Sequence, residues 1–364
     1  MRQFSYIIRY ALALLTVLPA GCDVHEFPDI PPSVEFRLRL RYDTDMTLWE
    51  HTYDGQQTAE QGLGESYDNR SGSGCIRYVI RAYPQQTRQR ETREYIREFV
   101  FMRDAAEGYD CEYTLGLPGG AYELMVWSDL MPQEGAAPYH DAGDFGAIAL
   151  QGDHAGCTDL RDAFRGTGSL VLTADMVERA PETLTVAMQR PLAKFEFITD
   201  DVVEFMEKEA TRIAAMLGLN AEGAAAEGTD RDGEDAGTRT VKLEDYKVVF
   251  YYVGFMPCTY SLYTDRPVDS STGVLFESGL SRLSEAEAAL GFDYVFVNGS
   301  PSAVTVQIGI FDSTGLQLSL SKPIEVPLIR SRHTVVRGRF LMTETSGGVR
   351  IDAEFDGDHN LIFQ

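Results

Sequence analysis

Side chains that could do chemistry are thinly spread through this chain of 364 residues. None of its six histidines lies in a His-Glu-x-x-His motif, and no two of them share a helical turn. The pairs His140-Asp141 and His154-x-x-Cys157 offer ligand types that zinc uses, and both lie in the segment between Trp127 and residue 158. We expect this segment to be a solvated loop rather than a metal site.

Signatures of other catalytic sites do not occur in the sequence either. No Gly-x-Ser-x-Gly motif presents a serine nucleophile. Gly62-Leu-Gly64 lacks the third glycine and the preceding strand of a phosphate-binding loop. Many carboxylates are present, but their spacing singles out no pair for glycoside hydrolysis. A hydrolase is therefore the weakest hypothesis, and we expect no enzymatic activity and no cofactor.

Two acidic stretches are similar to calcium-binding loops. Residues 352–357 place oxygen ligands at alternate positions with a glycine sixth, but the closing position, which requires a bidentate glutamate, is Phe363. In residues 230–235 the glycine comes too early. We expect both stretches to be charged loops without a metal.

Aromatic side chains are the remaining candidates for a binding role. The chain has 18 tyrosines, 19 phenylalanines and 2 tryptophans, and most of them fall at inward strand positions, which indicates core packing. Trp49, near Asp45 and Glu50 at a strand end, is the best candidate for an exposed ring that stacks on a sugar.

The N-terminal segment has the pattern of an export signal. Two arginines and a short apolar run lead to small residues that stand directly before Cys22. This arrangement resembles the lipobox of bacterial lipoproteins, although Pro19 stands where an apolar residue is usual. We expect a signal peptide at residues 1–21 and lipidation of Cys22. An ordinary secretory signal or an uncleaved anchor are the alternatives, and the apolar run is short for a spanning helix.

Charge and cysteine content narrow the possible partners and cofactors. The formal net charge of −24 argues against nucleic acid, because an acidic surface repels phosphates. No Cys-x-x-Cys motif occurs, so zinc and redox signatures are missing. The sequence leaves open whether the four cysteines after Cys22 form disulfides or stay free; they are Cys75, Cys111, Cys157 and Cys258.

The rest of the pattern is mainly that of β-strands. Residues 34–43 alternate apolar and charged side chains, which is typical of a half-buried strand. Similar short runs between turn signals indicate antiparallel sandwiches or barrels. Residues 246–256 are apolar on both faces and predict a central strand, while Asp312 to Gly315 predicts a hairpin turn.

Helices and loops are predicted at four places. A short helix is expected at residues 158–165, and a longer one from Asp201 to about Leu217, with an apolar stripe that packs against a sheet. Residues 52–74 have the composition of a loop. Residues 220–239 cannot bury enough apolar area to become ordered and predict a mobile acidic loop.

The expected division of the chain follows from these elements. After the signal peptide, residues 22–33 are acidic and proline-rich, as in an extended tether. A boundary at residue 190 then separates an N-terminal sandwich at residues 34–190 from a C-terminal sandwich at residues 191–364.

Several short motifs, in a specific order, resemble those of fimbrillin-like surface lipoproteins of Gram-negative anaerobes, and most closely the minor fimbrial subunit or fimbrial anchor branch. They are residues 117–129 (LPGGAYELMVWSD), 144–150, 159–166, 190–195 (RPLAKF) and 326–341. The resemblance implies a mainly β fold of two tandem transthyretin-like Greek-key β-sandwich domains with a few short helices. It also implies a non-enzymatic lipoprotein, held at the outer membrane and cell surface through Cys22, that joins fimbrial or pilus subunits by β-strand exchange.

Within that family role, the exchanged strand is predicted from the pattern. We expect residues 34–43 to stay in place as the chain's own first strand, and residues 350–363, which also alternate, to be exchanged or folded back. The alternative is an adhesin or glycan-binding surface lipoprotein that uses the same sandwiches for cell adhesion to a host or bacterial ligand.

Overall fold

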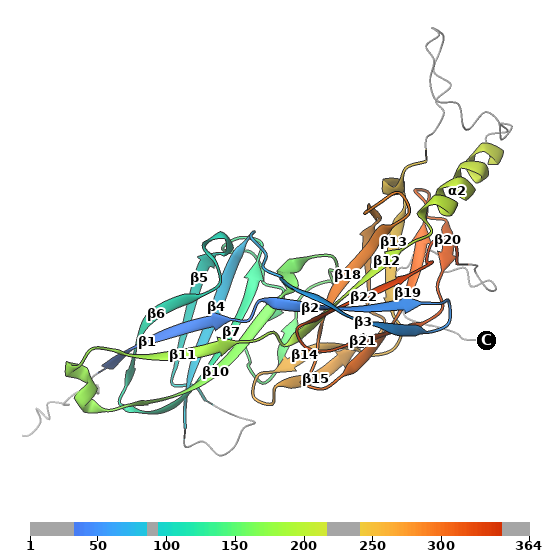
Figure 1. Ribbon diagram of the computed structural model, residues 1–364. Helices are drawn as coiled ribbons and strands as arrows, with labels where there is room; N and C mark the ends of the chain where they lie inside the picture. The colour runs from blue at the N-terminus through green and yellow to red at the C-terminus, as the bar shows by residue number, and fades with distance from the viewer. Residues whose placement is uncertain (1–32, 86–93, 217–240, 344–364) are drawn as a thin grey trace, which may run out of the picture.

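The computed structural model describes residues 33–85, 94–216 and 241–343. Strands dominate this part of the chain and form five sheets around two large apolar cores (Figure 1). The predicted mainly β class with few helices is confirmed.

The first core lies between a three-stranded and a four-stranded sheet. The predicted alternation of the first strand is confirmed, because Val34, Phe36, Leu38 and Leu40 are completely buried between these sheets. The three-stranded sheet has the order β11 (Glu182–Met188), β1 (Ser33–Tyr42) and β6 (Cys111–Pro118). The four-stranded sheet has the order β10 (Ala163–Leu172), β7 (Gly120–Met131), β4 (Cys75–Pro84) and β5 (Arg97–Asp104).

The second core lies between a six-stranded and a five-stranded sheet. The larger sheet has the order β17 (Ser281–Arg282), β18 (Ala288–Phe296), β12 (Leu192–Thr199), β22 (Arg332–Gly338), β2 (Asp45–Tyr53) and β3 (Thr58–Asp68). The other contains β16 (Leu275–Gly279), β13 (Lys247–Tyr252), β19 (Ser302–Phe311) and β20 (Gln317–Leu320), with β21 (Ile324–Leu328) also beside β19. β13 lies between two strands, as predicted, and the predicted turn at Asp312 to Gly315 joins β19 to β20.

Helical segments are few in the described residues. The longer predicted helix is confirmed as α2 (Val202–Met216), whose first turns bury Val202 and Phe205, whereas Met216 at its end is 68% exposed. The 3-10 helices are η1 (Ala105–Glu107), η2 (Asp159–Arg161), η3 (Ala174–Glu178) and η5 (Leu243–Asp245). In this part of the chain no helix is both long and apolar enough to cross a membrane.

The short helix predicted at residues 158–165 is wrong after its first turn. η2 ends at Arg161, and β10 begins two residues later. β10 pairs with β7 over its whole length, and Phe164 enters the first core. Strand pairing and burial therefore outweigh the local helical pattern.

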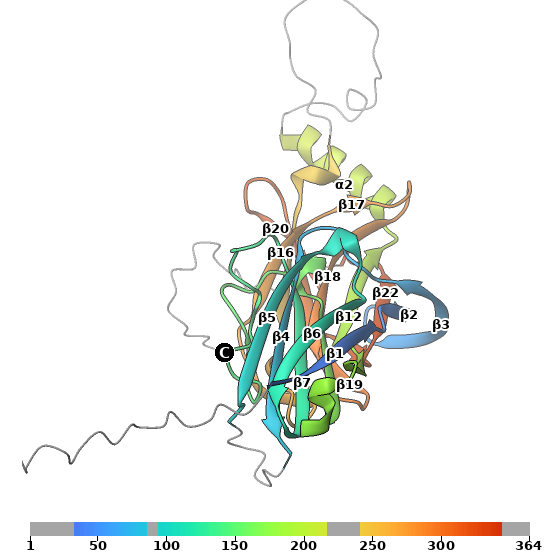
Figure 2. The ribbon, with the colours of Figure 1, turned by 90° about the vertical axis from the view of Figure 1, so that its left-hand side faces the viewer.

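Two hairpins cross from the first half of the chain into the sheets of the second. Residues 52–74 were expected to form a loop, but they contain β3, which pairs with β2 at the edge of the six-stranded sheet (Figure 2). β2 in turn pairs in parallel with β22, so residues 45–68 belong by pairing with the second sandwich, although they precede residue 190. In a fifth sheet, β8 (His140–Asp141) and β9 (Ile148–Leu150) continue into β14 (Met256–Ser261) and β15 (Arg266–Ser271).

Candidate functional site at the junction of the two sandwiches

A third apolar cluster fills the junction between the two sandwiches. Trp127 of β7 is completely buried there, and its ring centroid lies 6.4 Å from that of Tyr260 in β14 and 6.5 Å from that of Phe296 in β18. The cluster thus joins strands from both halves of the chain. Its buried members are Val79, Tyr83, Met125, Trp127, Ala142, Phe145, Ile148, Ala163, Leu192, Tyr260, Leu262, Tyr294 and Phe296.

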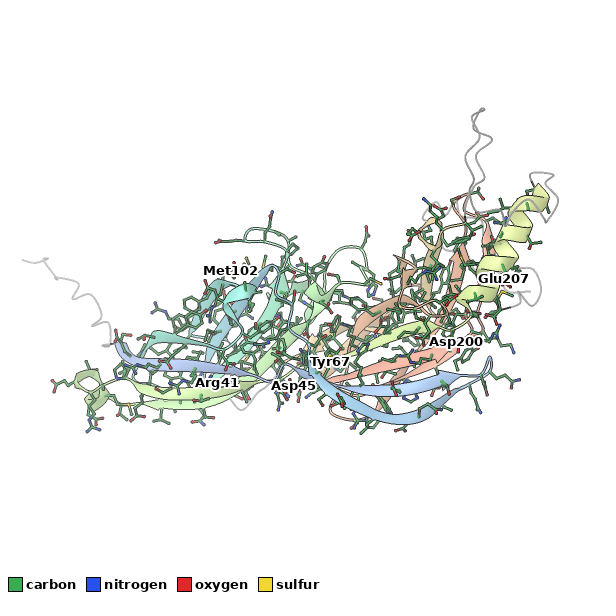
Figure 3. The ribbon with its side chains drawn as sticks, turned by 45° about the horizontal axis from the view of Figure 1, so that its top comes forward. Arg41, Asp45, Tyr67, Met102, Asp200 and Glu207 are labelled. Carbon is green, nitrogen blue, oxygen red and sulfur yellow. The ribbon has the colours of Figure 1, made fainter. Side chains whose placement is uncertain are left out.

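Arg190 forms the most deeply buried ion pair of this junction. Its Nε donates to both carboxylate oxygens of Asp162, at 3.0 and 2.9 Å, and both side chains are almost inaccessible to solvent. Its other nitrogens donate to the backbone carbonyls of Asp45 (3.1 Å) and Asn69 (3.0 Å), at the two ends of the β2–β3 hairpin. In Figure 3, Asp45 and Tyr67 lie in the middle of the molecule, where the sandwiches meet. Burial raises the pKa of Asp162 above its ordinary value, and Arg190 offsets this only in part.

A second buried group is centred on Asp293 of β18. Arg161 donates to Oδ1, Tyr252 donates to Oδ2 at 2.6 Å, and His154 Nε2 lies 2.6 Å from Oδ2. Burial favours the neutral acid, but the charge of Arg161 and the contact with His154 outweigh it and lower the pKa of Asp293. The carboxylate therefore holds residues of the first half, Arg161 and His154, against β13 and β18.

Three further carboxylates complete the charged junction. Asp159 accepts from Lys194 Nζ at 3.0 Å and from the Tyr294 hydroxyl at 2.6 Å. Asp129 accepts from Nε and Nη2 of Arg77 at 2.9 and 2.6 Å. The last of them, Asp265, accepts from Arg165, Tyr260 and Arg330.

A cleft of about 810 Å³ opens beside the Asp293 group. Its walls are residues 149–155, β14 and the segment 271–277, and His154 and Arg161 reach it. Both oxygens of Asp293 already accept hydrogen bonds, one of them from the backbone N–H of Tyr294 at 2.7 Å. Because Arg161 and Tyr252 bind the same carboxylate as His154, this histidine is held as a structural partner rather than set against a nucleophile.

The residues singled out from the sequence are not gathered in one place. Trp49, expected to be exposed, is only 8% exposed, and the guanidinium of Arg332 lies 5.2 Å from its ring centroid. That prediction is wrong because Trp49 lies inside β2 rather than at its end, and its ring packs against Arg332 and against His51, whose ring centroid is 4.6 Å away. The segment expected to be a solvated loop also contains completely buried His140, which lies against Trp127.

The remaining predictions concern the cysteines, the metal sites and segments outside the described residues. Cys75, Cys111, Cys157 and Cys258 are free in the structure. Among the residues with a described position, no three His, Cys, Asp or Glu side chains are grouped as metal ligands would be. Cys22, the acidic stretches at 230–235 and 352–357, the mobile loop at 220–239 and the segment 350–363 lie outside the described residues.

The charged junction was not predicted from the sequence, although the motifs contained it. Asp129, Arg161, Asp162, Arg190 and Lys194 all lie within the stretches that carry the family resemblance. The available signal was a charge next to apolar residues, as Lys194 stands between Ala193 and Phe195, because a charge that becomes buried must find a partner.

Several solved structures are similar to this chain. One is a candidate adhesin from Bacteroides ovatus ATCC 8483, with 10% identity over 86% of this chain and 88% of that chain and a TM-score of 0.39. Another is the fimbrial anchor protein Mfa2 from Porphyromonas gingivalis, with 8% identity, 79% and 82% coverage and a TM-score of 0.35. A fimbrial assembly protein from Parabacteroides distasonis ATCC 8503 shows 10% identity, 85% and 92% coverage and a TM-score of 0.35.

Comparison of sequences places the chain in a family. No curated protein matches it. One family model matches residues 32–364, which is almost the whole length after the predicted tether. The chain belongs to this family, which is described as a family of unknown function, DUF6562.

Proposed function

We propose that the protein is a non-enzymatic cell-surface lipoprotein, attached to the outer membrane through Cys22, that serves as a fimbrial anchor or minor pilus subunit. One observation carries the proposal. Charged side chains of the recognised motifs meet where the two sandwiches are joined, as Arg190 does with Asp162 and Lys194 with Asp159. A body joined in this way suits a protein whose task is to hold other proteins.

We further propose that partner subunits attach by backbone pairing. The environment of β1 supports attachment by backbone pairing, because β1 is paired along both edges and its alternate side chains fill the first core. A subunit that lacked such a strand would accept an alternating segment from a neighbour. The donor in this chain is residues 350–363, where Ile351, Ala353 and Phe355 alternate with acidic residues.

β1 itself is proposed to stay in place. Its outward arginines are tied to the neighbouring strand and turn, since Arg39 pairs with Glu112 at 2.8 Å and Arg41 with Asp110 at 2.5 Å. Its continuous pairing with β6 and β11 would have to be broken before any exchange at this position.

Affinity purification from intact cells tests the partner. The wild-type chain should recover a fimbrial subunit, and a variant without residues 350–363 should not. The matched control keeps the composition of these residues but permutes their order, so that the alternation is lost; it should fail like the deletion. Full recovery of the subunit by the deletion variant would contradict strand donation, and recovery of polysaccharide alone would favour the adhesin alternative.

A second measurement tests the attachment. Cells are labelled with a palmitate analogue, and the membrane fraction is compared for the wild type and Cys22→Ala. The wild type should carry the label and sediment with the outer membrane, whereas the variant should carry no label and be released. Retention of unlabelled Cys22→Ala protein in the membrane would refute lipid attachment at this residue.

A further inference from the structure

Two long ribbons of the chain, β1–β2 and β11–β12, run through both sandwiches and lie side by side in the first. β1 continues into β2 after two residues, and β11 continues into β12 after three, so each ribbon runs in one direction through the molecule (Figure 1). In the first sandwich the ribbons are paired in parallel, from Phe36 with Glu182 to Tyr42 with Met188. In the second sandwich they separate, and β22 lies between β2 and β12, parallel to both.

The first and last described strands are therefore each held along both edges. β1 lies between β6 and β11, and β22 lies between β2 and β12. The register of β22 pairs seven of its residues with β2 and six with β12. After β22 the chain stays attached, because Phe340 and Leu341 are buried in the second core and the backbone N–H of Met342 donates to Asp201 at 2.9 Å.

Arg190 joins the two ribbons at the point where they separate. It lies in the connection from β11 to β12 and donates to the carbonyl of Asp45 at the start of β2. The start of β22 is tied to both ribbons at the same level, since the N–H of Ser331 donates to Leu192 at 3.1 Å and its carbonyl accepts from Thr47 at 3.3 Å. Hydrogen bonds therefore join β22 to both ribbons at the place where the ribbons separate.

The strand directions decide how this arrangement responds to tension. β1, β2 and β22 run the same way, so the N-terminal end of β1 and the C-terminal end of β22 lie at opposite ends of the molecule. A pull on these two ends slides β22 lengthwise along β2. Ladder hydrogen bonds lie across the strands, so such shear loads all of them together, whereas peeling from one end breaks them in turn.

We propose that β1, β2, β12 and β22 form a mechanical clamp, and that the protein bears tension along its length between an N-terminal tether and a partner on its C-terminal side. The idea rests on the proposed function, because tension arises only in a chain attached at both ends. The clamp itself is a property of the folded body and can be measured on the isolated protein.

Single-molecule force spectroscopy tests the clamp by changing only the direction of the pull. In the first geometry, residues 23–364 carry handle domains at both ends, which loads β22 against β2 in shear. In the second, one handle stays at the C-terminus and the other is ligated to a tag inserted after Gln56, in the exposed turn between β2 and β3. This turn follows the C-terminal end of β2, beside the C-terminal end of β22, so the same strands are peeled apart.

The expected result is an unfolding force at least about two-fold higher in shear than in peeling at the same pulling speed, because forced unfolding follows the barrier along the loaded direction. The tagged chain pulled end to end is the matched control and should reproduce the untagged force. Equal forces in the two geometries, or a lower force end to end, would overturn the clamp.

The outcome separates the clamp from the proposed function. A low end-to-end force in a protein whose Cys22 is shown to carry lipid refutes the clamp and leaves the attachment standing. A high force in a protein that stays on the membrane as Cys22→Ala supports the clamp and refutes the attachment.

Discussion

Removing the guanidinium of Arg190 should destabilise the whole molecule. In the variant Arg190→Met the apolar stem is kept, but Asp162 stays buried without its paired guanidinium, and the carbonyls of Asp45 and Asn69 each lose a donor. Removing one partner of a buried ion pair typically lowers the free energy of unfolding by about 3–5 kcal/mol. We expect a loss in this range, because both members of the pair are almost fully buried.

Urea unfolding followed by tryptophan fluorescence measures this loss. The two tryptophans report on both parts of the molecule, since Trp127 lies in the junction and Trp49 in the six-stranded sheet. The matched control is Arg41→Met, which removes an ion pair to Asp110 in which both side chains are about half exposed. Exposed pairs contribute little, so the control should lie within about 1 kcal/mol of the wild type.

The dependence on pH distinguishes a lost charge from lost packing. Burial raises the pKa of Asp162 in the folded protein, and without Arg190 that pKa rises further. A folded-state pKa above the unfolded value means that the folded protein binds the proton more tightly, so folding gains stability as the pH falls through the folded pKa toward the unfolded value. The deficit of Arg190→Met should therefore shrink as the pH is lowered from neutral toward 3.8, the ordinary pKa of an aspartate. A deficit below about 1 kcal/mol, or one that is constant across this range, would refute the reasoning.

Two further predictions concern packing and acid stability. Gly166→Ala should lower the free energy of unfolding by about 1–3 kcal/mol, because a Cβ there would lie 2.5 Å from a side-chain carbon of Val186. The control is Gly279→Ala, where a Cβ meets nothing within 4 Å. Equal urea midpoints for the two variants would contradict the packing argument. The pKa of Asp293 is lowered, because Arg161 and His154 outweigh the effect of burial, so its contribution to stability is present at neutral pH and is lost as the pH falls from the ordinary value of 3.8 toward the folded value. Asp293→Asn should therefore make the free energy of unfolding fall less steeply below about pH 4 than in the wild type, as measured by urea titration at a series of pH values. An equally steep fall in the variant would show that this carboxylate is not the titrating group.

Elements with one buried face were predictable from the sequence. β1 alternates because its even-numbered side chains enter the first core, and α2 carries apolar residues at helical spacing because one side of its first turns is buried. The turn before β20 was also predictable, since Gly315 adopts a positive φ of 84°, which glycine allows without strain. In each case the signal lies within a few neighbouring residues.

Elements held by pairing alone gave no such signal. β3 is exposed along most of its length, and even Leu63 is 56% exposed. It is a strand because its backbone bonds to β2, and backbone hydrogen bonds place no requirement on side-chain pattern. Trp49 was misjudged for the related reason that Arg332, which covers its ring, comes from β22, a strand far away in the sequence.

The sequence by itself determined the β class, the position of the main helix and the short motifs that resemble those of fimbrillin-like proteins. Only the tertiary structure decided that β22 inserts between β2 and β12 and that Arg190 meets Asp162 in the interior. The physical reason is that residue types and periodicity report how a segment is buried, whereas pairings between distant segments depend on which edges and charges the folded chain brings together.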